Sequence, residues 1–379
     1  MKINQVEAYP ISFPIPEQHR VKLGIGQTVK RDAVLVKVTT DSGLTGWGEA
    51  HAARAPTAMA ELINSTLRHL VTGRDASDTE AIWDHVFRMQ IASHGMGTAA
   101  VIGLSGIDLA LWDIRAKSAG LPLNRFLGGQ HKPVESYAGG VSLGYQPPEA
   151  LIAEIEKLTA RGYRAVKLRV GDSVDRDRAR IESVREHFGK ELDILVDANT
   201  AYSIEDARSI SAALEANAIG WLEEPFSPQH YENYRELAKH TKVPLAAGEN
   251  HYTRFDFLRM LDDGAITIWQ PDLSKCGGLT EALRIAELAA PHGITIHPHT
   301  SLTGINMAAS IHFLSAIDNA GYFEADVSVY NPFRDDLTGP AHQILAAGMV
   351  QNLEAPGIGV ELDESLLKHY PVISGPGYI

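Results

Sequence analysis

Cysteine is nearly absent from this sequence, in which Cys276 is the one example among 379 residues. A disulfide framework and a zinc site built from cysteines are therefore excluded. Long apolar runs are absent too. None approaches the roughly 18 residues of a membrane-spanning helix, and the first residues lack the apolar centre of a signal peptide. We expect a cytoplasmic protein with no membrane partner.

Positive charge is also in short supply. Lys and Arg number 34 against 47 Asp and Glu, which gives a formal net charge of −13. This balance argues against nucleic acid or an anionic membrane surface as the main partner. With 44% apolar residues the chain is globular, and its length favours two domains over one. The partner we expect is a small molecule.

The first 130 residues predict an α+β domain. Apolar and polar residues alternate in three segments typical of antiparallel strands, the last two joined by a turn at residues 41–43. A long loop that contains Pro and Gly, residues 14–30, separates the first two. Three segments with helical spacing follow. The predicted strands are 2–13, 32–40 and 44–50, and the predicted helices are 56–71, 79–89 and 98–120.

The pattern changes at about residue 134, where short apolar strands begin to alternate with amphipathic helices. The uninterrupted β-α order predicts a parallel sheet. Eight units over roughly 200 residues fit a closed barrel better than an open sheet. We place the barrel at residues 131–332. The remaining segment, 333–379, leaves this rhythm and is expected to pack back on the N-terminal domain.

Ionisable residues stand at the carboxyl ends of seven successive barrel strands. In a (β/α)8 barrel these ends form the active-site face, so scattered surface charge is a poor explanation. Glu224 has the opposite strand parity to Glu223 and is set aside. The residues are Lys167 and Arg169, Asp197 and Asn199, Glu223, Glu249, Asp272, His297 and His299, and Glu324.

Three of these residues indicate a metal site. Asp197, Glu223 and Glu249 are each 26 residues apart, one β/α unit, which places them on adjacent strands at one level. Three buried carboxylates repel one another, and a divalent cation resolves the conflict. Oxygen-only ligands favour Mg²⁺, with Mn²⁺ as the alternative. The competing interpretation is that one or two are ordinary salt-bridge partners.

A second group indicates acid/base chemistry. Asp272 and His299 lie on neighbouring strands, and a carboxylate beside a histidine fixes its tautomer and raises its basicity. His297 lies one step deeper and is expected to be a hydrogen-bonded core residue. Glu324 is either an acid with a raised pKa or a salt-bridge partner of a cation.

Together these residues point to removal of the proton next to a substrate carboxylate. The product is an enediolate, whose extra charge a metal and nearby cations stabilise most in the transition state. Lys167 and Arg169 alternate on one face of their strand, so both cations are predicted to point at this site. Metal-dependent hydrolysis is disfavoured because it often uses histidine ligands.

Several motifs resemble the enolase superfamily, and within it the mandelate racemase subgroup. They are "GWGEA", "SGIDLALWDI", Lys-x-Arg, "VDAN", "WLEEP", "GEN", "QPDLSKCGG" and "NPF" in that order. The resemblance implies a (β/α)7β barrel under a capping domain, residues 1–130, completed by the C-terminal segment. It matches Asp197, Glu223 and Glu249 to magnesium ligands, Asp272 and His299 to an Asp-His dyad, and Glu324 to a strand-eight acid. It also implies a homo-oligomer.

One position departs from this pattern. The subgroup commonly has Lys-x-Lys on strand two, where the second Lys is a base, and here that residue is Arg169. A guanidinium is a poor base near neutrality. A racemase with two matched bases is therefore disfavoured, and His299 takes the leading acid/base role with Lys167 as its rival. Arg169 becomes an electrostatic clamp.

We therefore predict a lyase: a dehydratase that converts a sugar acid or hydroxy diacid to a 2-keto-3-deoxy acid. Epimerisation, racemisation or lactone cycloisomerisation is the alternative, and a non-catalytic barrel is the remote one. The resemblance implies that the loop 14–30 and the turn near 51–56 close the site. His19, Arg20 and Lys22 of this loop, and Asn199, are predicted to bind substrate.

Overall fold

An antiparallel sheet of three strands begins the chain in this computed structural model, which describes residues 1–93, 95–300, 302–339 and 341–379. The sheet has the order β1-β4-β5. Its strands are β1 (Ile3–Pro14), β4 (Lys30–Thr40) and β5 (Thr45–His51). The predicted strands are thus present, and the loop between the first two holds a short hairpin, β2 (Lys22–Leu23) and β3 (Gly26–Gln27).

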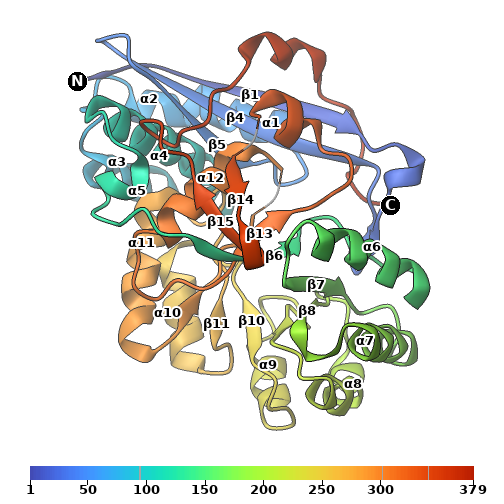
Figure 1. The fold of residues 1–379 in the computed structure, drawn as a ribbon. Coiled ribbons are helices and arrows are strands. Elements are labelled where there is room, and N and C mark those ends of the chain that lie inside the picture. The colour runs from blue at the N-terminus through green and yellow to red at the C-terminus, as the bar shows by residue number, and fades with distance from the viewer. Residues whose placement is uncertain (94, 301, 340) are drawn as a thin grey trace.

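Helices cover one face of this sheet (Figure 1). Residues 56–71 form one continuous helical stretch, because a π-helical turn joins α1 (Pro56–Leu62) to α2 (Arg68–Val71). α3 (Thr79–Val86) and α4 (Thr98–Ser118) follow. α4 lies so close to β5 that a Cβ on Gly48 would stand 2.0 Å from the carbonyl oxygen of Gly106. No helix of the described residues has both the length and the apolar content that crossing a membrane requires.

The alternation along β5 sorts its side chains between two environments. Gly48 and Ala50 face α4, and Ala50 belongs to the core that the sheet shares with its helices. Trp47 lies in the other core, which extends through the barrel. Because successive strand residues point to opposite faces, Glu49 and His51 share the barrel-facing side with Trp47. In the segment "GWGEAH" the glycines therefore face the helix, and Trp47, Glu49 and His51 face the barrel.

Eight parallel strands form the barrel, as predicted (Figure 1). The circle closes where β13 pairs with β6 and where Ile296 bridges to Ala320. Seven helices connect the strands, which is the (β/α)7β arrangement. The strands are β6 (Val134–Gly139), β7 (Ala165–Arg169), β8 (Asp193–Asp197), β9 (Leu222–Glu223), β10 (Leu245–Ala247), β11 (Ile268–Trp269), β12 (Thr295–Ile296) and β13 (Phe323–Asp326). The helices are α6 (Pro148–Ala160), α7 (Val174–Phe188), α8 (Ile204–Ala216), α9 (Tyr231–Ala238), α10 (Thr253–Asp263), α11 (Gly278–Ala289) and α12 (Gly304–Leu314).

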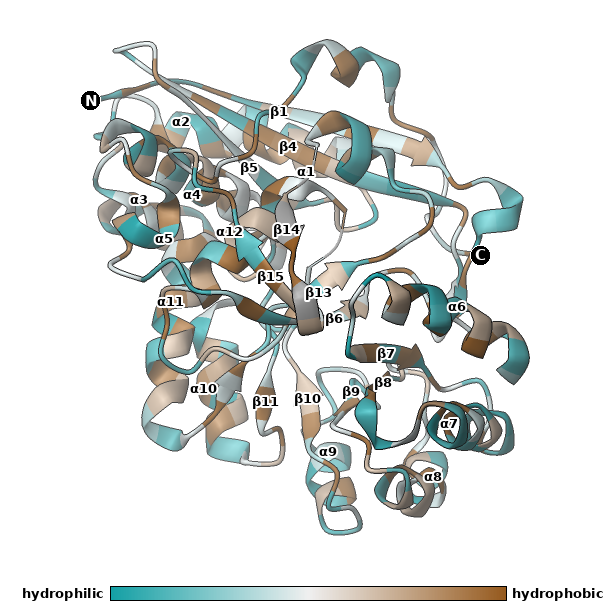
Figure 2. Ribbon diagram, viewed as in Figure 1, coloured by the Kyte–Doolittle hydropathy of each residue, from teal (hydrophilic) through white to brown (hydrophobic). Residues whose placement is uncertain are grey.

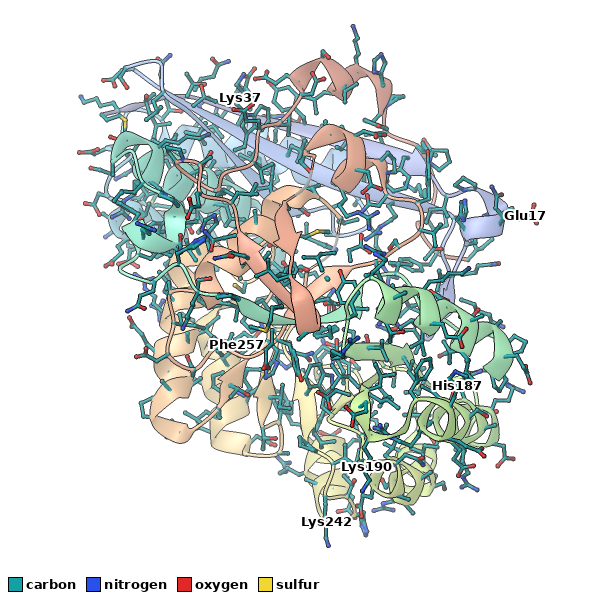
Figure 3. All side chains as sticks on the ribbon, viewed as in Figure 1. Glu17, Lys37, His187, Lys190, Lys242 and Phe257 are labelled. Carbon is teal, nitrogen blue, oxygen red and sulfur yellow. The ribbon has the colours of Figure 1, made fainter. Side chains whose placement is uncertain are left out.

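Hydropathy follows this layering (Figure 2). Val166 and Leu168 of β7 point outward into the core between strands and helices. Phe257 of α10 is fully buried, whereas the labelled lysines Lys190 and Lys242 project into solvent (Figure 3). Since Lys167 has the opposite parity to Val166 and Leu168, it points into the barrel.

The C-terminal segment returns to both parts of the molecule. Its hairpin, β14 (His342–Ile344) and β15 (Met349–Asn352), pairs antiparallel with β6. Beyond it, the chain crosses the capping sheet, where Ser12 N donates to Tyr370 O at 3.2 Å and Val29 N to Gly377 O at 2.9 Å. The division into 1–130, 131–332 and 333–379 stays a proposal. In this structure the last segment first pairs with the barrel strand β6 and only afterwards, further along the chain, bonds to the capping sheet.

A set of polar contacts fastens α4 to the first turn of α11. Asp108 accepts from Thr280 N at 2.9 Å, and Ser105 Oγ accepts from Gly277 N at 2.9 Å. Trp112 Nε1 donates to Thr280 Oγ1 at 2.8 Å. Asp108 therefore caps a barrel helix from the other domain, since the first N–H groups of a helix lack partners inside it. These contacts join the segment "SGIDLALWDI" of the capping domain to the segment "KCGGLT" of the barrel.

Replacement of Gly278 by Ala is expected to disrupt this contact. Gly278 has φ +86°, and a Cβ there would lie 2.4 Å from Asp108 Oδ2. Gly43→Ala is the matched control, because Gly43 has φ +83° with nothing within 4 Å. The control is expected to cost about 1–2 kcal/mol of unfolding free energy for the left-handed backbone alone. Thermal unfolding should show a clearly larger loss for Gly278→Ala; equal losses would contradict the steric argument.

Candidate active site

A cavity of about 280 Å³ lies between the capping domain and the carboxyl ends of the barrel strands. The barrel contributes polar side chains, including Arg169, Glu249 and His299. The capping domain contributes residues from β4, from the end of β5 and from the loop 14–30, and the C-terminal segment adds Tyr378. The remaining polar lining consists of Lys30, Arg31, Asp32, His51, Arg54, Asn199, Thr200, Glu224, Asn250 and Lys275.

The two cations of β7 are fully engaged with carboxylates. Lys167 Nζ lies 2.8 Å from Glu223 Oε1 and 3.0 Å from Glu324 Oε1, and 3.7 Å from Asp197 Oδ2. Burial opposes the charge on Lys167, but Glu223 and Glu324 hold its pKa well above the ordinary value. Lys167 is therefore an ammonium ion in this structure and has no lone pair with which to act as a base.

Arg169 is held by several acceptors at once. Its Nη1 donates to the carboxylate of Asp197 and to Asn199 Oδ1, the latter at 3.2 Å, and its Nη2 donates to the carbonyl oxygen of Gly140. A planar guanidinium holds its acceptors with separate nitrogens in a fixed fork, whereas a lysine has a single nitrogen on a flexible stem. The arginine that departs from the Lys-x-Lys pattern therefore ties the ends of β6, β7 and β8 together.

The carboxylates at the ends of β8 and β9, Asp197 and Glu223, repel each other. Burial raises the pKa of Glu223 to about 7; Lys167 opposes this shift, while Asp197 and Glu324 add to it. A divalent cation relieves such repulsion, and an all-oxygen donor set without sulfur fits Mg²⁺. Glu249 stands two residues beyond β10, next in the barrel. The donors on these three adjacent strands therefore fit the metal by chemical type and by their order in the barrel.

In this structure the same carboxylates hold cations of the protein. Arg169 binds Asp197, Lys167 binds Glu223, and His299 binds Glu249 at 2.7 Å. Among residues 1–93, 95–300, 302–339 and 341–379, no group of three Asp, Glu, His or Cys side chains is positioned to hold one ion. The metal-ligand role of the three carboxylates stays a prediction.

The structure brings Asp272 and His299 together, with Asp272 Oδ2 2.7 Å from His299 Nδ1. Ser274 N and Asn306 Nδ2 donate to the other oxygen of Asp272 at 2.8 and 3.0 Å. Burial opposes ionisation, but His299 and Lys275 hold the pKa of Asp272 down at about 2. The carboxylate is therefore anchored on one oxygen and orients the imidazole with the other.

The second nitrogen of His299 contacts Glu249, with Nε2 2.7 Å from Oε2. Burial disfavours the charged ring, but Glu249 and Asp272 together raise the pKa of His299 well above its ordinary value. His299 is thus an imidazolium between two carboxylates. His299 also lines the cavity. If its contact with Glu249 were lost, the protonation of His299 would change.

Two expectations left open by the sequence can now be decided on geometry. His297 is a core residue, because Tyr322 N donates to its Nδ1 at 2.9 Å and its Nε2 contacts Thr295 Oγ1 at 3.0 Å. Burial opposes ionisation of Glu324, but Lys167 and His299 hold its pKa below the ordinary value. In this structure Glu324 is therefore a salt-bridge partner of Lys167, and its role as an acid in the reaction stays a prediction.

The predicted substrate-binding residues separate into two groups. Asn199 lines the cavity, where its Nδ2 donates to Asp197 Oδ2 at 3.1 Å. His19, Arg20 and Lys22 do not line it. His19 stacks on Tyr330 with ring centres 6.1 Å apart, Arg20 Nε donates to a backbone oxygen, and Lys22 is exposed. In the β2–β3 hairpin alternate residues face opposite ways, so Leu23 lines the cavity instead, together with Ile25.

Other cavity residues were missed or dismissed from the sequence. Glu224 was set aside on strand parity, but the strand ends at Glu223 and Glu224 has φ +35°, which turns it into the cavity. Asn250 Nδ2 donates to it at 3.0 Å, and burial raises its pKa well above the ordinary value. Lys275 lies in the segment after β11 and His51 is the last residue of β5, and nearness to a strand end is the only signal that the sequence carries for them.

Comparisons with known proteins agree with this geometry. Residues 8–128 match the family described as "Mandelate racemase / muconate lactonizing enzyme, N-terminal domain", and residues 150–366 match "Enolase C-terminal domain-like". The chain belongs to the enolase superfamily. The resemblance inferred from the motifs and the fold predicted with it are therefore confirmed.

Relatives of known name share nearly the whole chain. The chain is 32% identical to a D-galactarolactone cycloisomerase of Agrobacterium fabrum, over 90% of this chain and 92% of that protein. It is 33% identical to a D-galactonate dehydratase of Ralstonia pickettii, over 88% and 90%. A solved enolase-superfamily member from a Polaromonas species is 51% identical, with a TM-score of 0.97 over 100% of both chains.

Magnesium is present in a solved enolase-superfamily relative. That structure is a racemase from Streptomyces coelicolor with bound magnesium, 27% identical to this chain over 98% of this chain and 100% of that one, with a TM-score of 0.86.

Proposed function

We propose that this enolase-superfamily chain is an acid-sugar dehydratase that removes the proton α to a carboxylate and expels a β-hydroxyl. The observation that carries the proposal is which side chains reach the cavity. His299 lines it with Asp272 fixing its orientation, whereas Lys167 is not among the lining residues and Arg169 is a guanidinium bound to Asp197. One oriented acid/base group suits dehydration, which needs no second base.

The chain's own residues account for the proton transfers. In the reaction His299 must first be neutral, which requires that Glu249 no longer hold its Nε2. That nitrogen, the one not held by Asp272, then takes the proton from the α-carbon, and the electron pair forms the enediolate of the substrate carboxylate. Lys167 and Arg169 stabilise the added negative charge because they are preorganised cations in a buried site. As the β C–O bond breaks, the same nitrogen returns its proton to the departing hydroxyl, which leaves as water. The enol then tautomerises to a 2-keto-3-deoxy acid.

Asp197, Glu223 and Glu249 are the residues that would hold Mg²⁺, with Mn²⁺ as the alternative. When bound, the ion supplies Lewis-acid stabilisation of negative charge on the substrate carboxylate. Carboxylates that held the ion would no longer be available to Arg169, Lys167 and His299, which they contact in this structure. The presence of magnesium in the Streptomyces coelicolor relative supports the assignment.

The test is a screen of aldonates, aldarates and their lactones with MgCl₂ in deuterated water. Formation of a keto acid is followed chemically, and α-proton exchange by NMR. We expect at least one substrate to give a keto acid and the activity to disappear with EDTA. If no compound shows exchange or keto acid with Mg²⁺ or Mn²⁺, the proposal fails.

Lactone cycloisomerisation is the second candidate, and the match to the D-galactarolactone cycloisomerase favours it. It also begins with loss of an α-proton, so the same group serves it. The two reactions are separated by product: a cycloisomerase incorporates solvent deuterium and forms an isomer with no keto acid. That result in the screen would replace dehydration by cycloisomerisation.

A further inference from the structure

Lys275 forms a polar site in the cavity that the proposed proton transfers do not use. It is 5% exposed and lines the cavity. No side-chain hydrogen bond or ion pair of Lys275 is found within the described part of the chain. Burial opposes its charge, but Glu249 and Asp272, beyond ion-pair distance, raise its pKa above the ordinary lysine value. A buried charge without a direct partner is costly, so this ammonium is available to an anion.

His51 lies beside this lysine and adds a neutral donor. Its backbone N–H donates to Ser274 O at 3.0 Å, which fixes the end of β5 against the segment that carries Lys275. Ala53 N donates to His51 Nδ1 at 3.0 Å, so the ring hydrogen is on Nε2. Burial and the charge of Lys275 lower the pKa of His51 to about 3, which keeps the ring neutral.

Arg54 is the other cavity cation that has no carboxylate partner in the described residues. Its guanidinium lies over the ring of Tyr378, 5.1 Å from the ring centre. The remaining cations of the lining are each matched: Lys30 with Asp32, Arg31 with Asp326, Arg169 with Asp197, and His299 with Asp272 and Glu249. The unmatched positive charge of the cavity is therefore carried by Lys275 and Arg54.

We infer that the substrate carries a second anionic group, and that Lys275, His51 and Arg54 bind it as a subsite for the distal carboxylate of a hydroxy dicarboxylate. The inference rests on the proposed function, which uses the first carboxylate at the β7 cations. Glu224 faces the same cavity, but Asn250 Nδ2 donates to both of its oxygens, at 3.1 and 3.0 Å, which leaves Lys275 as the unpartnered group.

The test compares a six-carbon diacid, galactarate, with the corresponding monoacid, galactonate. In wild type we expect the higher kcat/KM for galactarate. Lys275→Met is expected to lower the ratio of the two kcat/KM values by at least about tenfold, since it removes a buried charge from a bound anion. Lys275→Arg should restore part of the ratio. Lys242→Met, an exposed lysine far from the cavity (Figure 3), is the matched control.

Binding separates this inference from the proposed function. Calorimetry with galactarate and magnesium-loaded protein measures the subsite without turnover, and Lys275→Met should weaken binding by at least about tenfold. Weakened binding with no turnover of any compound would support the subsite and overturn the dehydratase proposal. Turnover with a galactarate-to-galactonate ratio that Lys275→Met leaves unchanged would overturn the subsite alone. Circular dichroism checks that each variant is folded.

A second inference arises from two buried oxygens near the dyad. Glu49 is fully buried; its Oε2 accepts from Thr303 Oγ1, and its Oε1 has no hydrogen-bond partner among the described residues. Asn306 Nδ2 donates to Asp272, while Asn306 Oδ1 likewise has none. Thr303 Oγ1, which donates to Glu49, also accepts from Ile305 N at 3.1 Å, so the Glu49 carboxyl lies at the helix turn that carries Asn306.

Two unpartnered acceptors side by side are costly, but one proton satisfies both. We propose that Glu49 is protonated on Oε1, donates to Asn306 Oδ1, and so positions the amide that anchors Asp272. The charged groups facing Glu49 are Asp272 and Arg31. Burial is the main cause that raises the pKa of Glu49 to about 8, and Asp272 adds to it. The proton is present below that pH and is lost above it.

The test uses Glu49→Gln and Glu49→Ala. Gln is neutral and retains an N–H donor, so we expect kcat within about threefold of wild type, whereas Ala should lower kcat by about tenfold or more with little change in KM. The fall in wild-type kcat above pH 8 should be absent in Glu49→Gln. An infrared carboxylic-acid band at neutral pH, lost in Glu49→Gln, reports the proton directly. Equal damage by Gln and Ala, or no such band, would overturn the inference.

Discussion

Replacing His299 by Asn is expected to lower kcat by about 10³-fold or more, and to abolish α-proton exchange. His299 is proposed to remove one proton and return it, and a positioned acid/base group contributes about 10²–10⁴-fold for a single transfer. Asp272 would remain in place, because Ser274 and Asn306 hold its other oxygen. Steady-state kinetics with the best substrate of the screen, and deuterium exchange followed by NMR, measure the two effects.

His187→Asn is the matched control for this experiment. His187 lies on α7, is exposed and contacts Glu156 at 3.0 Å, far from the cavity (Figure 3). Its replacement should leave kcat unchanged. Should His299→Asn exchange the α-proton at the wild-type rate while Lys167→Ala does not, the assignment is wrong and Lys167 is the base. Its pKa would then have to be lowered by release from Glu223 and Glu324.

Replacing Lys167 by Met is expected to destabilise the metal-free protein by about 3–5 kcal/mol, because removal of one partner leaves buried charges without compensation. Lys167 is 1% exposed and contacts Glu223 and Glu324 directly. Thermal and urea unfolding in EDTA measure the loss. Addition of MgCl₂ should recover part of it, since a cation among the carboxylates replaces the missing charge.

Arg176→Met is the control for a salt bridge of a different kind. Arg176 pairs with Asp172 at 2.6 Å, but its side chain is 64% exposed. Solvent screens such a pair, so the unfolding midpoint should barely move. A loss for Lys167→Met no larger than that of this control would show that the carboxylates tolerate one another without the ammonium. The case for a metal between them would then be lost as well.

The sequence predicted the parts of the molecule that follow a repeating pattern. Alternation in β7 put Lys167 inside the barrel, and the regular β/α spacing made Asp272 and His299 neighbours, which the 2.7 Å contact bears out. The roles of these residues stay predictions. Strand periodicity fixes the direction of a side chain only while the strand lasts, and the active-site face begins where the strands end.

The departures from prediction all lie where that periodicity ends. Glu224 enters the cavity because its backbone is left-handed, which strand parity does not foresee. His19 and Lys22 turn away because His19 ends a short 3-10 turn and Lys22 begins a hairpin, where an irregular loop was expected. Ionisation states could not be predicted from the sequence either. Lys167 lowers the pKa of Glu324, and this effect depends on distances that only the folded chain defines.

The pairing of residues 27–29 with residues 377–379 has a consequence for synthesis on the ribosome. Gln27 N donates to Ile379 O at 2.7 Å and Ile379 N to Gln27 O at 3.0 Å, while Tyr378 lines the cavity. The N-terminal sheet emerges first, yet one wall of the cavity waits until residues 377–379 have been translated. Contacts of such sequence separation form late because loop closure precedes any gain from them. A nascent chain can therefore complete its barrel strands before it has a closed cavity.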